Sequence, residues 1–176
     1  MLLVLTLFIG PAVRSQEAVS ADQLKGAFLY RFVQFVEWPT NAFAGDTAPM
    51  ILGVLGSDKF ATELASLLKE KKAHNRPFVV KKLSAASDAA TCQVVFVADG
   101  DGRRAALVAE ATRGKPILLV GEHEEFLQNG GMINIVQDEK QKQLRFDIAP
   151  KNAEKANLTI SSHLLRLARK KTGGGE

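Results

Sequence analysis

Three short, almost wholly apolar runs in the middle of the chain constrain the fold more than any other feature. They are Met50–Leu55, Gln93–Ala98 and Ile117–Val120. Apolar runs of this length, bounded by glycine, proline or polar residues, are typical of strands that are buried on both faces. Such strands occur in parallel sheets whose two faces are covered by helices. The sequence therefore predicts a sheet with helices on both sides.

Helical patterns fill the intervals between these strands. One helix is predicted over 59–72, with Ser57 or Asp58 as its N-cap, and another over 103–113. A further strand is predicted over 78–83, where apolar and other residues alternate. Strands that alternate with helices in this way indicate an α/β domain.

The last third of the chain departs from this alternation. Two apolar segments, 132–136 and 143–148, flank a polar turn and predict a β-hairpin. A short helix is expected over 122–128 and a helical tail over 152–171. An antiparallel hairpin beside parallel strands makes a mixed sheet. The predicted fold class is therefore α/β: a three-layer, Rossmann-like mixed β-sheet flanked by helices, in a single domain.

An aromatic helix is predicted before the first strand. The segment 24–39 holds the only tryptophan and the only tyrosine of a chain in which 7% of the residues are aromatic. Four apolar side chains share one helical face: Phe28, Phe32, Phe35 and Val36. Pro39 ends the helix, because a proline disfavours helical backbone in the residue before it. We expect a core helix whose last aromatic residue, Trp38, is partly exposed and anchors a partner.

The N-terminus has the features of a secretory leader. An apolar run over 2–9 is followed by a Gly-Pro pair and by small residues up to Ser15, the order found in a cleaved signal peptide. The run is much shorter than the roughly 20 residues that span a bilayer. We expect a signal peptide at 1–15, an exported α/β domain at 22–170 and a flexible tail at 171–176.

Composition narrows the class of protein further. A chain of 176 residues that is 46% hydrophobic has the size and the apolar content of one globular domain. Its net charge of +4 comes from dispersed basic residues, so we expect no nucleic-acid partner. Cys92 is the only cysteine, which excludes an intrachain disulfide. A lone cysteine beside a strand is typically a small buried apolar residue, and an intermolecular or redox thiol is the alternative.

No motif in the sequence predicts catalysis. The turn Gly53–Asp58 has glycines like a phosphate-binding loop, but its spacing is not G-x-G-x-x-G and no Walker lysine follows, so a capping turn is favoured. His123 stands among three glutamates without a second histidine at i+4, which favours a solvated helix start over a metal site. Ser57 and Ser162, the latter beside His163, lack the context of a hydrolase nucleophile. We expect no enzyme, no metal and no cofactor.

Several blocks, taken in chain order, resemble one protein family. They are Ala27–Phe32 running into Phe35-Val36-Glu37-Trp38-Pro39, Cys92–Val97, Pro116–Gly121, Phe126 before Gly130-Gly131-Met132-Ile133, Leu144–Ile148, and Leu158 with Ile160–Ala168. Their combination resembles the YfiR/HmsC-like family of periplasmic proteins. The resemblance extends from Asp22 to Ala168.

This resemblance implies a small periplasmic α/β domain, often a homodimer, without catalytic activity. The best-studied members of the family restrain an inner-membrane diguanylate cyclase by binding its periplasmic sensor region, which limits cyclic-di-GMP and biofilm formation. Two positions depart from the family's pattern. Cys92 has no partner for disulfide pairing, and Ala149 stands where asparagine is expected. These departures put redox gating, and a polar role at that turn, in doubt.

The residues and the family resemblance together leave two functional hypotheses open. The first is a non-enzymatic periplasmic signalling modulator that binds and restrains an inner-membrane diguanylate cyclase or a similar sensor. The second is a periplasmic small-ligand sensor or carrier, with an anionic or aromatic metabolite in a cleft bordered by Arg31, Trp38, Arg145 and His163. The residues predicted to bind the partner or the ligand are Arg31, Glu37, Trp38, Arg145 and His163.

Overall fold

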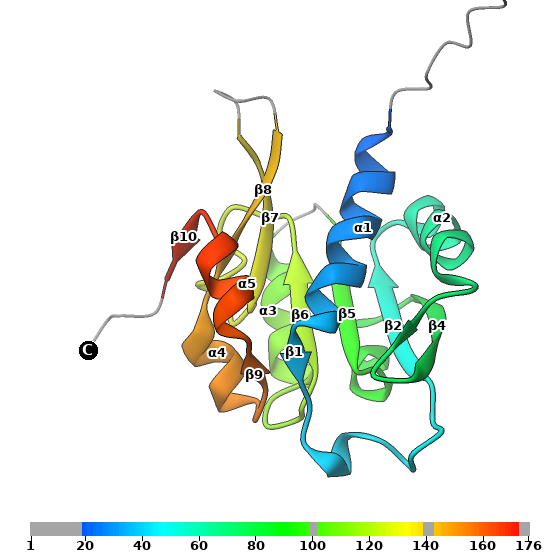
Figure 1. Cartoon of the computed structure of the whole chain (residues 1–176). Helices are drawn as coiled ribbons and strands as arrows, with labels where there is room; N and C mark the ends of the chain where they lie inside the picture. The colour runs from blue at the N-terminus through cyan, green and yellow to red at the C-terminus, as the bar shows by residue number, and fades with distance from the viewer. Residues whose placement is uncertain (1–18, 99–101, 139–142, 173–176) are drawn as a thin grey trace, which may run out of the picture.

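A computed structural model describes residues 19–98, 102–138 and 143–172 of the chain (Figure 1). The predicted signal peptide lies outside these ranges. In chain order the elements are α1 (Ala21–Gln34), β1 (Val36–Glu37), η1 (Thr40–Ala42), β2 (Met50–Leu55), α2 (Asp58–Leu68), β3 (Lys72–Ala73), β4 (Arg76–Leu83), η2 (Ala86–Thr91), β5 (Val94–Val97), α3 (Gly102–Ala111), β6 (Leu118–Gly121), β7 (Ile133–Asp138), β8 (Gln143–Ile148), α4 (Pro150–Lys155), β9 (Thr159–Ile160), α5 (Ser162–Leu167) and β10 (Lys170–Lys171). None of the helices in the described ranges has the length and apolarity needed to cross a membrane.

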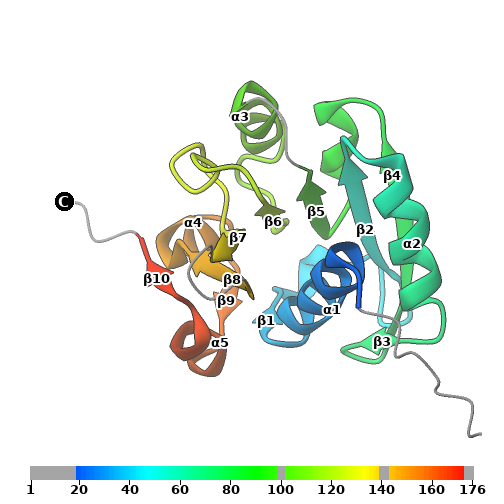
Figure 2. The same cartoon turned by 90° about the horizontal axis from the view of Figure 1, so that it is seen from above.

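Within the described ranges, eight strands form the main sheet in the order β10-β8-β7-β6-β5-β2-β4-β3. Strands β4, β2, β5, β6 and β7 run parallel to one another, and β8 returns antiparallel to β7. Helices α1 and α2 lie on one side of the sheet and α3 on the other (Figure 2). The predicted single α/β domain with a mixed sheet and helices on both faces is therefore confirmed, and so is the β7–β8 hairpin.

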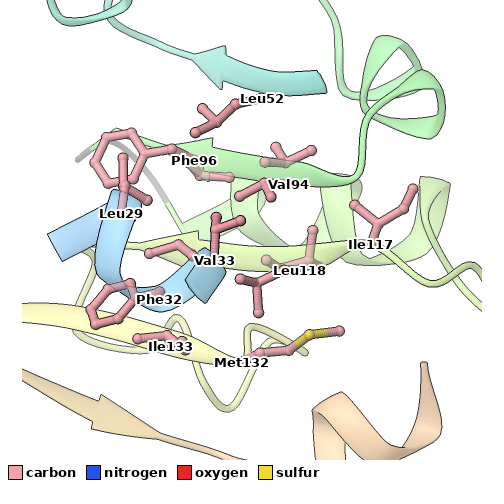
Figure 3. Packing of buried hydrophobic residues seen from close by; sticks show 14 of the residues in the cluster. Leu29, Phe32, Val33, Leu52, Val94, Phe96, Ile117, Leu118, Met132 and Ile133 are labelled. Atoms are coloured by element: carbon pink, nitrogen blue, oxygen red, sulfur yellow. The ribbon is translucent and has the colours of Figure 1, made fainter. Parts of the chain in front are cut away.

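The core lies between α1 and the sheet. Figure 3 shows Leu29, Phe32 and Val33 of α1 among side chains of the central strands, and all three are fully buried. Burying an apolar side chain of this size stabilises the fold by about 1.5 to 3 kcal/mol. The ring of Phe32 also packs against the edge of Phe146 on β8, with centroids 5.0 Å apart. Helix α1 thus joins the parallel strands to the hairpin.

The first turn of α1 is stabilised by a capping box. The side chain of Ser20 accepts a hydrogen bond from the backbone N–H of Gln23 at 3.1 Å, and the Gln23 side chain accepts one from the backbone of Ser20 at 2.9 Å. Further along the helix, Gly26 lets α2 approach closely. A Cβ atom at this position would lie 3.3 Å from the side chain of Leu67.

The prediction that the aromatic helix runs to Pro39 is wrong. Helix α1 ends at Gln34, and Val36–Glu37 form β1, which pairs antiparallel with β9. The backbone N–H of Ser161 donates to the carbonyl oxygen of Phe35 at 2.9 Å, so strand pairing replaces the helical hydrogen bonds. Val36 is fully buried, but as a strand residue and not as part of a helical face.

The short helix predicted over 122–128 is also wrong, because this segment forms successive turns. The turns enclose the buried ring of Phe126, which packs against Gly121 and Gly131 so closely that a Cβ atom at either glycine would overlap with the ring. The backbone N–H of Gly131 donates to the carbonyl oxygen of Phe126 at 2.9 Å. Burial of one aromatic ring over two glycines therefore decides the path of this segment.

The continuous helical tail predicted over 152–171 is a third error. The segment is divided among α4, β9, α5 and β10. Asn157 adopts a φ of 56°, in the left-handed region that asparagine tolerates and that a helix cannot continue through. Leu158 and Ile160 are buried while Thr159 is exposed, the period of a strand. The last strand, β10, includes the first residue of the predicted tail and pairs with β8.

Candidate functional site

Trp38 follows β1 and belongs to a group of four side chains, Trp38, Phe43, His74 and Arg76, that we call the Trp38 cluster. The indole ring lies edge-on to Phe43 and to His74, with centroid distances of 6.5 and 6.0 Å. The guanidinium of Arg76 stacks 3.9 Å from the Phe43 ring centroid and donates to two backbone carbonyls at 2.7 Å. Trp38 is partly exposed, as the sequence predicts.

The indole nitrogen of Trp38 is the unusual atom of this cluster. Nε1 is buried and has no hydrogen-bond partner in the described part of the structure. A buried N–H without an acceptor costs about 1 to 3 kcal/mol. Tryptophan combines a large apolar ring with one polar edge, which is why it is enriched at interfaces. The cluster therefore joins partly exposed ring surface to a donor that has no acceptor among the described residues.

Three other predicted residues lie around the β1–β9 ribbon. Glu37 is exposed on β1. His163, near the start of α5, packs its ring 5.0 Å from that of Phe35, and Arg31 is exposed one helical turn before Phe35. Because β1 and β9 are antiparallel, Trp38 and His163 lie beyond opposite ends of the ribbon. The structure thus places His163 against the Phe35 ring, away from Trp38.

Arg145 lies on the other face of the hairpin. Its neighbour Phe146 packs against aromatic rings of α1. Successive residues of a strand point to opposite faces, so the partly buried Arg145 points away from α1. Arg31, Trp38, Arg145 and His163 therefore do not border one cleft. The role of each in binding stays a prediction.

The turn Gly53–Asp58 is a helix cap. The side chain of Ser57 accepts a hydrogen bond from the backbone N–H of Phe60 at 3.2 Å, which confirms Ser57 as the N-cap of α2. Gly56 has a φ of 95°, and a Cβ atom on it would lie 2.5 Å from Nη1 of Arg104. The side chain of Arg104 therefore occupies the space beside Gly56. In a phosphate-binding loop, the corresponding space stays open for the ligand.

Cys92 is packed as a small apolar residue. Burial raises the pKa of its thiol, and a hydrogen bond from Thr91 opposes this rise only in part. The sulfur lies 2.8 Å from where a Cβ atom on Gly53 would be, so the thiol fills the space over that glycine. In the described ranges, no group of three or more histidine, cysteine, aspartate or glutamate side chains is placed to hold a metal ion.

Sequence reasoning missed a cavity of about 480 Å³ between the first turns of α1, the end of β6 and the β7–β8 hairpin. In Figure 1 the hairpin extends past the ends of the parallel strands, on the same side as the start of α1. We call this cavity the polar notch and define it by five of its lining residues: Lys25, Glu122, Glu124, Asn134 and Arg169.

Both basic side chains of the polar notch are held by carboxylates. Nζ of Lys25 lies 2.5 Å from Glu122 and 3.7 Å from Asp22. Arg169 donates from Nε and Nη2 to the two oxygens of the buried Asp147, at 2.9 and 2.6 Å. The hydrogen bond to Asp147 raises the pKa of Arg169. These ion pairs connect α1 to the end of β6, and the C-terminal segment to β8.

Asn134 contributes the most buried polar group of the notch. Its register partner on β8 is Asp147, and its own neighbours on β7, Ile133 and Ile135, are core residues. Buried polar side chains are uncommon and are normally hydrogen-bonded. The signal that would have found this site is a polar residue within an apolar strand, as in Ile-Asn-Ile and Phe-Asp-Ile.

The fold is that of a small α/β domain with a mixed sheet. The family model described as YfiR/HmsC-like matches residues 22–169, and the chain belongs to this family of regulatory, non-catalytic proteins. The match confirms the resemblance seen in the sequence blocks. Among curated proteins, no match to this chain was found.

One similar solved structure is the crystal structure of a conserved domain protein from Vibrio cholerae O1 biovar El Tor. The two chains share 14% identity with a TM-score of 0.54, over 87% of this chain and 60% of that one. The chain therefore spans about three fifths of that protein's length. Similarity at 14% sequence identity shows only that the two proteins share a fold.

Proposed function

We propose that this protein is a non-enzymatic periplasmic signalling modulator. It binds the periplasmic region of an inner-membrane diguanylate cyclase, or of a similar sensor, and restrains it, which limits cyclic-di-GMP and biofilm formation. Membership of the YfiR/HmsC-like family over residues 22–169 is the observation that carries the proposal. The apolar run and small residues at 1–15 support export.

The Trp38 cluster supplies the contact surface in this proposal. Binding energy at interfaces concentrates in a few aromatic and arginine side chains, with tryptophan foremost. Trp38 is held at a fixed angle by Phe43 and His74, so little side-chain entropy is lost when a partner covers it. Loss of a hot-spot tryptophan costs about 2 kcal/mol or more of binding free energy, which weakens a complex roughly 30-fold.

Capture of the cyclase from solubilised membranes tests this surface. The immobilised mature protein is compared with Trp38→Ala and with a matched control, Leu107→Ala, whose side chain is 55% exposed on α3 across the sheet. The wild type and the control should retain a diguanylate cyclase, and Trp38→Ala should lose it while unfolding cooperatively. Equal capture by all three would remove Trp38 as the anchor. Capture of no cyclase by the wild type would count against the function itself.

A homodimer is proposed on the same family grounds. Light scattering during size-exclusion chromatography should give twice the mass of the mature chain at micromolar concentration. The mass of one chain at every concentration tested would contradict it.

The ligand hypothesis has one contact in its favour. Phe35 and His163 form an aromatic pair, and the exposed Arg31 lies one helical turn away. Together they offer an aromatic or anionic metabolite a ring and a positive charge. A ligand that binds only the native state raises the melting temperature. Unchanged melting with aromatic amino acids, nucleotides and anions would remove this alternative.

A further inference from the structure

The outer edge of β4 is open along most of its length. Strand β4 lies beside β2 in the sheet (Figure 1) and pairs with it over residues 78–83. On its other side, β4 pairs with the two residues of β3, which lie opposite Arg76 and Pro77. No other strand of the described ranges pairs with 78–83 on that side. Every second residue of a strand directs its N–H and C=O groups to the same side, so this stretch presents unpaired backbone groups.

The segment that carries this edge holds most of the positive charge of the chain. Residues 69–83 contain six lysine or arginine residues and one acidic residue, Glu70, and so carry a net charge of +5. The whole chain carries +4, which leaves −1 for the rest of it. Among the described residues, Lys81 forms no ion pair, and Lys82 lies 3.9 Å from the exposed carboxylate of Asp58. An exposed pair of this kind contributes little. The edge therefore attracts an acidic ligand.

The side chains along the open edge divide into an apolar part and a basic part. Phe78, Val79 and Val80 are followed by Lys81 and Lys82. Val79 is 40% exposed, which is unusual for a large apolar side chain of this domain. Alternate residues point to opposite faces, so Val79 and Lys81 share one face of the sheet, and Val80 and Lys82 share the other. A strand laid along this edge would meet an apolar residue and then a lysine on each face.

The lysines decide between two possible occupants of the edge. A second copy of the chain would bring two basic edges together, and like charges placed opposite each other destabilise a strand pair. Native sheets use lysines on exposed edges in this way to prevent self-association. The same side chains would attract a strand of another protein that carries acidic residues. The charge of the edge therefore favours an acidic strand over a second copy.

The open edge is continuous with the Trp38 cluster. Two members of the cluster, His74 and Arg76, belong to the β3–β4 hairpin. His74 and Asn75 form its two-residue turn, with φ values of 49° and 64°, the left-handed values that a tight hairpin turn requires. From this turn, the open stretch of β4 runs for about 20 Å. A partner that covers Trp38 therefore lies next to the beginning of the edge.

We propose that an acidic, extended segment of the membrane partner adds to the open edge of β4 as a further strand. Its backbone groups pair with residues 78–83, two adjacent acidic side chains lie against Lys81 and Lys82, and apolar side chains cover Val79 and Val80. In such strand addition, backbone hydrogen bonds supply affinity and side chains supply specificity. This inference rests on the proposed function, because it names the part of the partner that the protein holds.

Site-specific photo-cross-linking in cells tests the proposal. The photoreactive residue p-benzoylphenylalanine replaces Val79 in one variant and, as a control, the 55% exposed Leu107 on α3, across the sheet, in another. After irradiation, mass spectrometry identifies the cross-linked protein and maps the segment that is joined. The Val79 position should yield a segment of a periplasmic region that contains two adjacent acidic residues. The Leu107 position should not yield it.

Charge reversal tests the contacts of the added strand. In the Val79 cross-linking variant, Lys81→Glu together with Lys82→Glu should lower the yield about tenfold or more. The matched control, Lys151→Glu with Lys155→Glu, makes the same change in charge at two exposed positions of α4 and should keep the yield. Replacing the two mapped acidic residues of the partner by lysine should restore the yield with Lys81→Glu and Lys82→Glu. Such a rescue separates lost pairing from lost folding.

Four outcomes would overturn the proposal: no cross-linked partner at Val79, a cross-link to a second copy of this chain, a mapped segment without acidic residues, and an unchanged yield after charge reversal. These results are distinguishable from failure of the proposed function. If the immobilised protein captures a cyclase but Val79 yields no cross-link, the function stands and strand addition is refuted. If Val79 yields an acidic segment of a membrane protein that is neither a cyclase nor a sensor, strand addition stands and the proposed function is refuted.

Discussion

The packing of Phe126 over two glycines predicts non-additive effects of substitutions at Gly121 and Phe126. The ring is 1% exposed, and a Cβ atom on Gly121 would lie 2.5 Å from ring carbon Cδ2. Gly121→Ala alone must displace the ring, an overpacking cost of about 1 to 3 kcal/mol. Phe126→Ala removes a buried aromatic side chain and costs about 3 to 5 kcal/mol.

In the double variant, the new methyl group enters the space that the ring has left. The overpacking cost disappears, so the free energy of unfolding should exceed the additive expectation by about 1 to 2 kcal/mol. Urea unfolding, followed by the fluorescence of Trp38, the only tryptophan, measures all four corners of this cycle. Additivity of the two substitutions within about 0.5 kcal/mol would refute the reasoning.

Two further predictions concern buried ionisable groups. Asp147→Asn removes the charge from the double hydrogen bond with the partly exposed Arg169 and should lower the free energy of unfolding by about 1 to 2 kcal/mol in the same urea assay. If Asp147→Asn lowered the free energy of unfolding as little as the exposed control Asp46→Asn does, the contact between Asp147 and Arg169 would not stabilise the fold as predicted. Because burial raises the pKa of the Cys92 thiol, the unfolded chain ionises first as the pH rises above about 8.5, and stability falls there. The Cys92→Ala variant should not lose stability in this pH range. If stability depended on pH identically in the wild type and in Cys92→Ala, the loss could not be attributed to Cys92.

Elements whose signals are local could be predicted from the sequence. The run Met50–Leu55 is apolar throughout because β2 is paired on both sides and covered on both faces. Ser57 caps α2 through a hydrogen bond to the backbone three residues ahead. The β7–β8 hairpin could likewise be predicted, since its two strands flank a short polar stretch of sequence. In each case the residues that decide the structure lie within a few positions of one another.

Features that depend on distant residues could not be predicted in this way. Val36–Glu37 form a strand only because Thr159–Ile160 lie beside them, and two-residue strands carry no periodicity. The path of the 124–130 turns depends on a ring that fits over Gly121 and Gly131. The polar notch was missed for the same reason, since its lining residues come from α1, the end of β6, the hairpin and the C-terminal segment, which are far apart in the sequence.

The level of cyclic-di-GMP in cells tests the central claim most directly. It is measured by mass spectrometry in the parent strain, in a strain that lacks the gene, and in that strain complemented with the wild type or with Trp38→Ala. Deletion should raise cyclic-di-GMP and surface attachment, the wild type should restore both, and Trp38→Ala should not, although it accumulates to the same amount. Unchanged cyclic-di-GMP after deletion, in a strain that normally expresses the protein, would contradict the account.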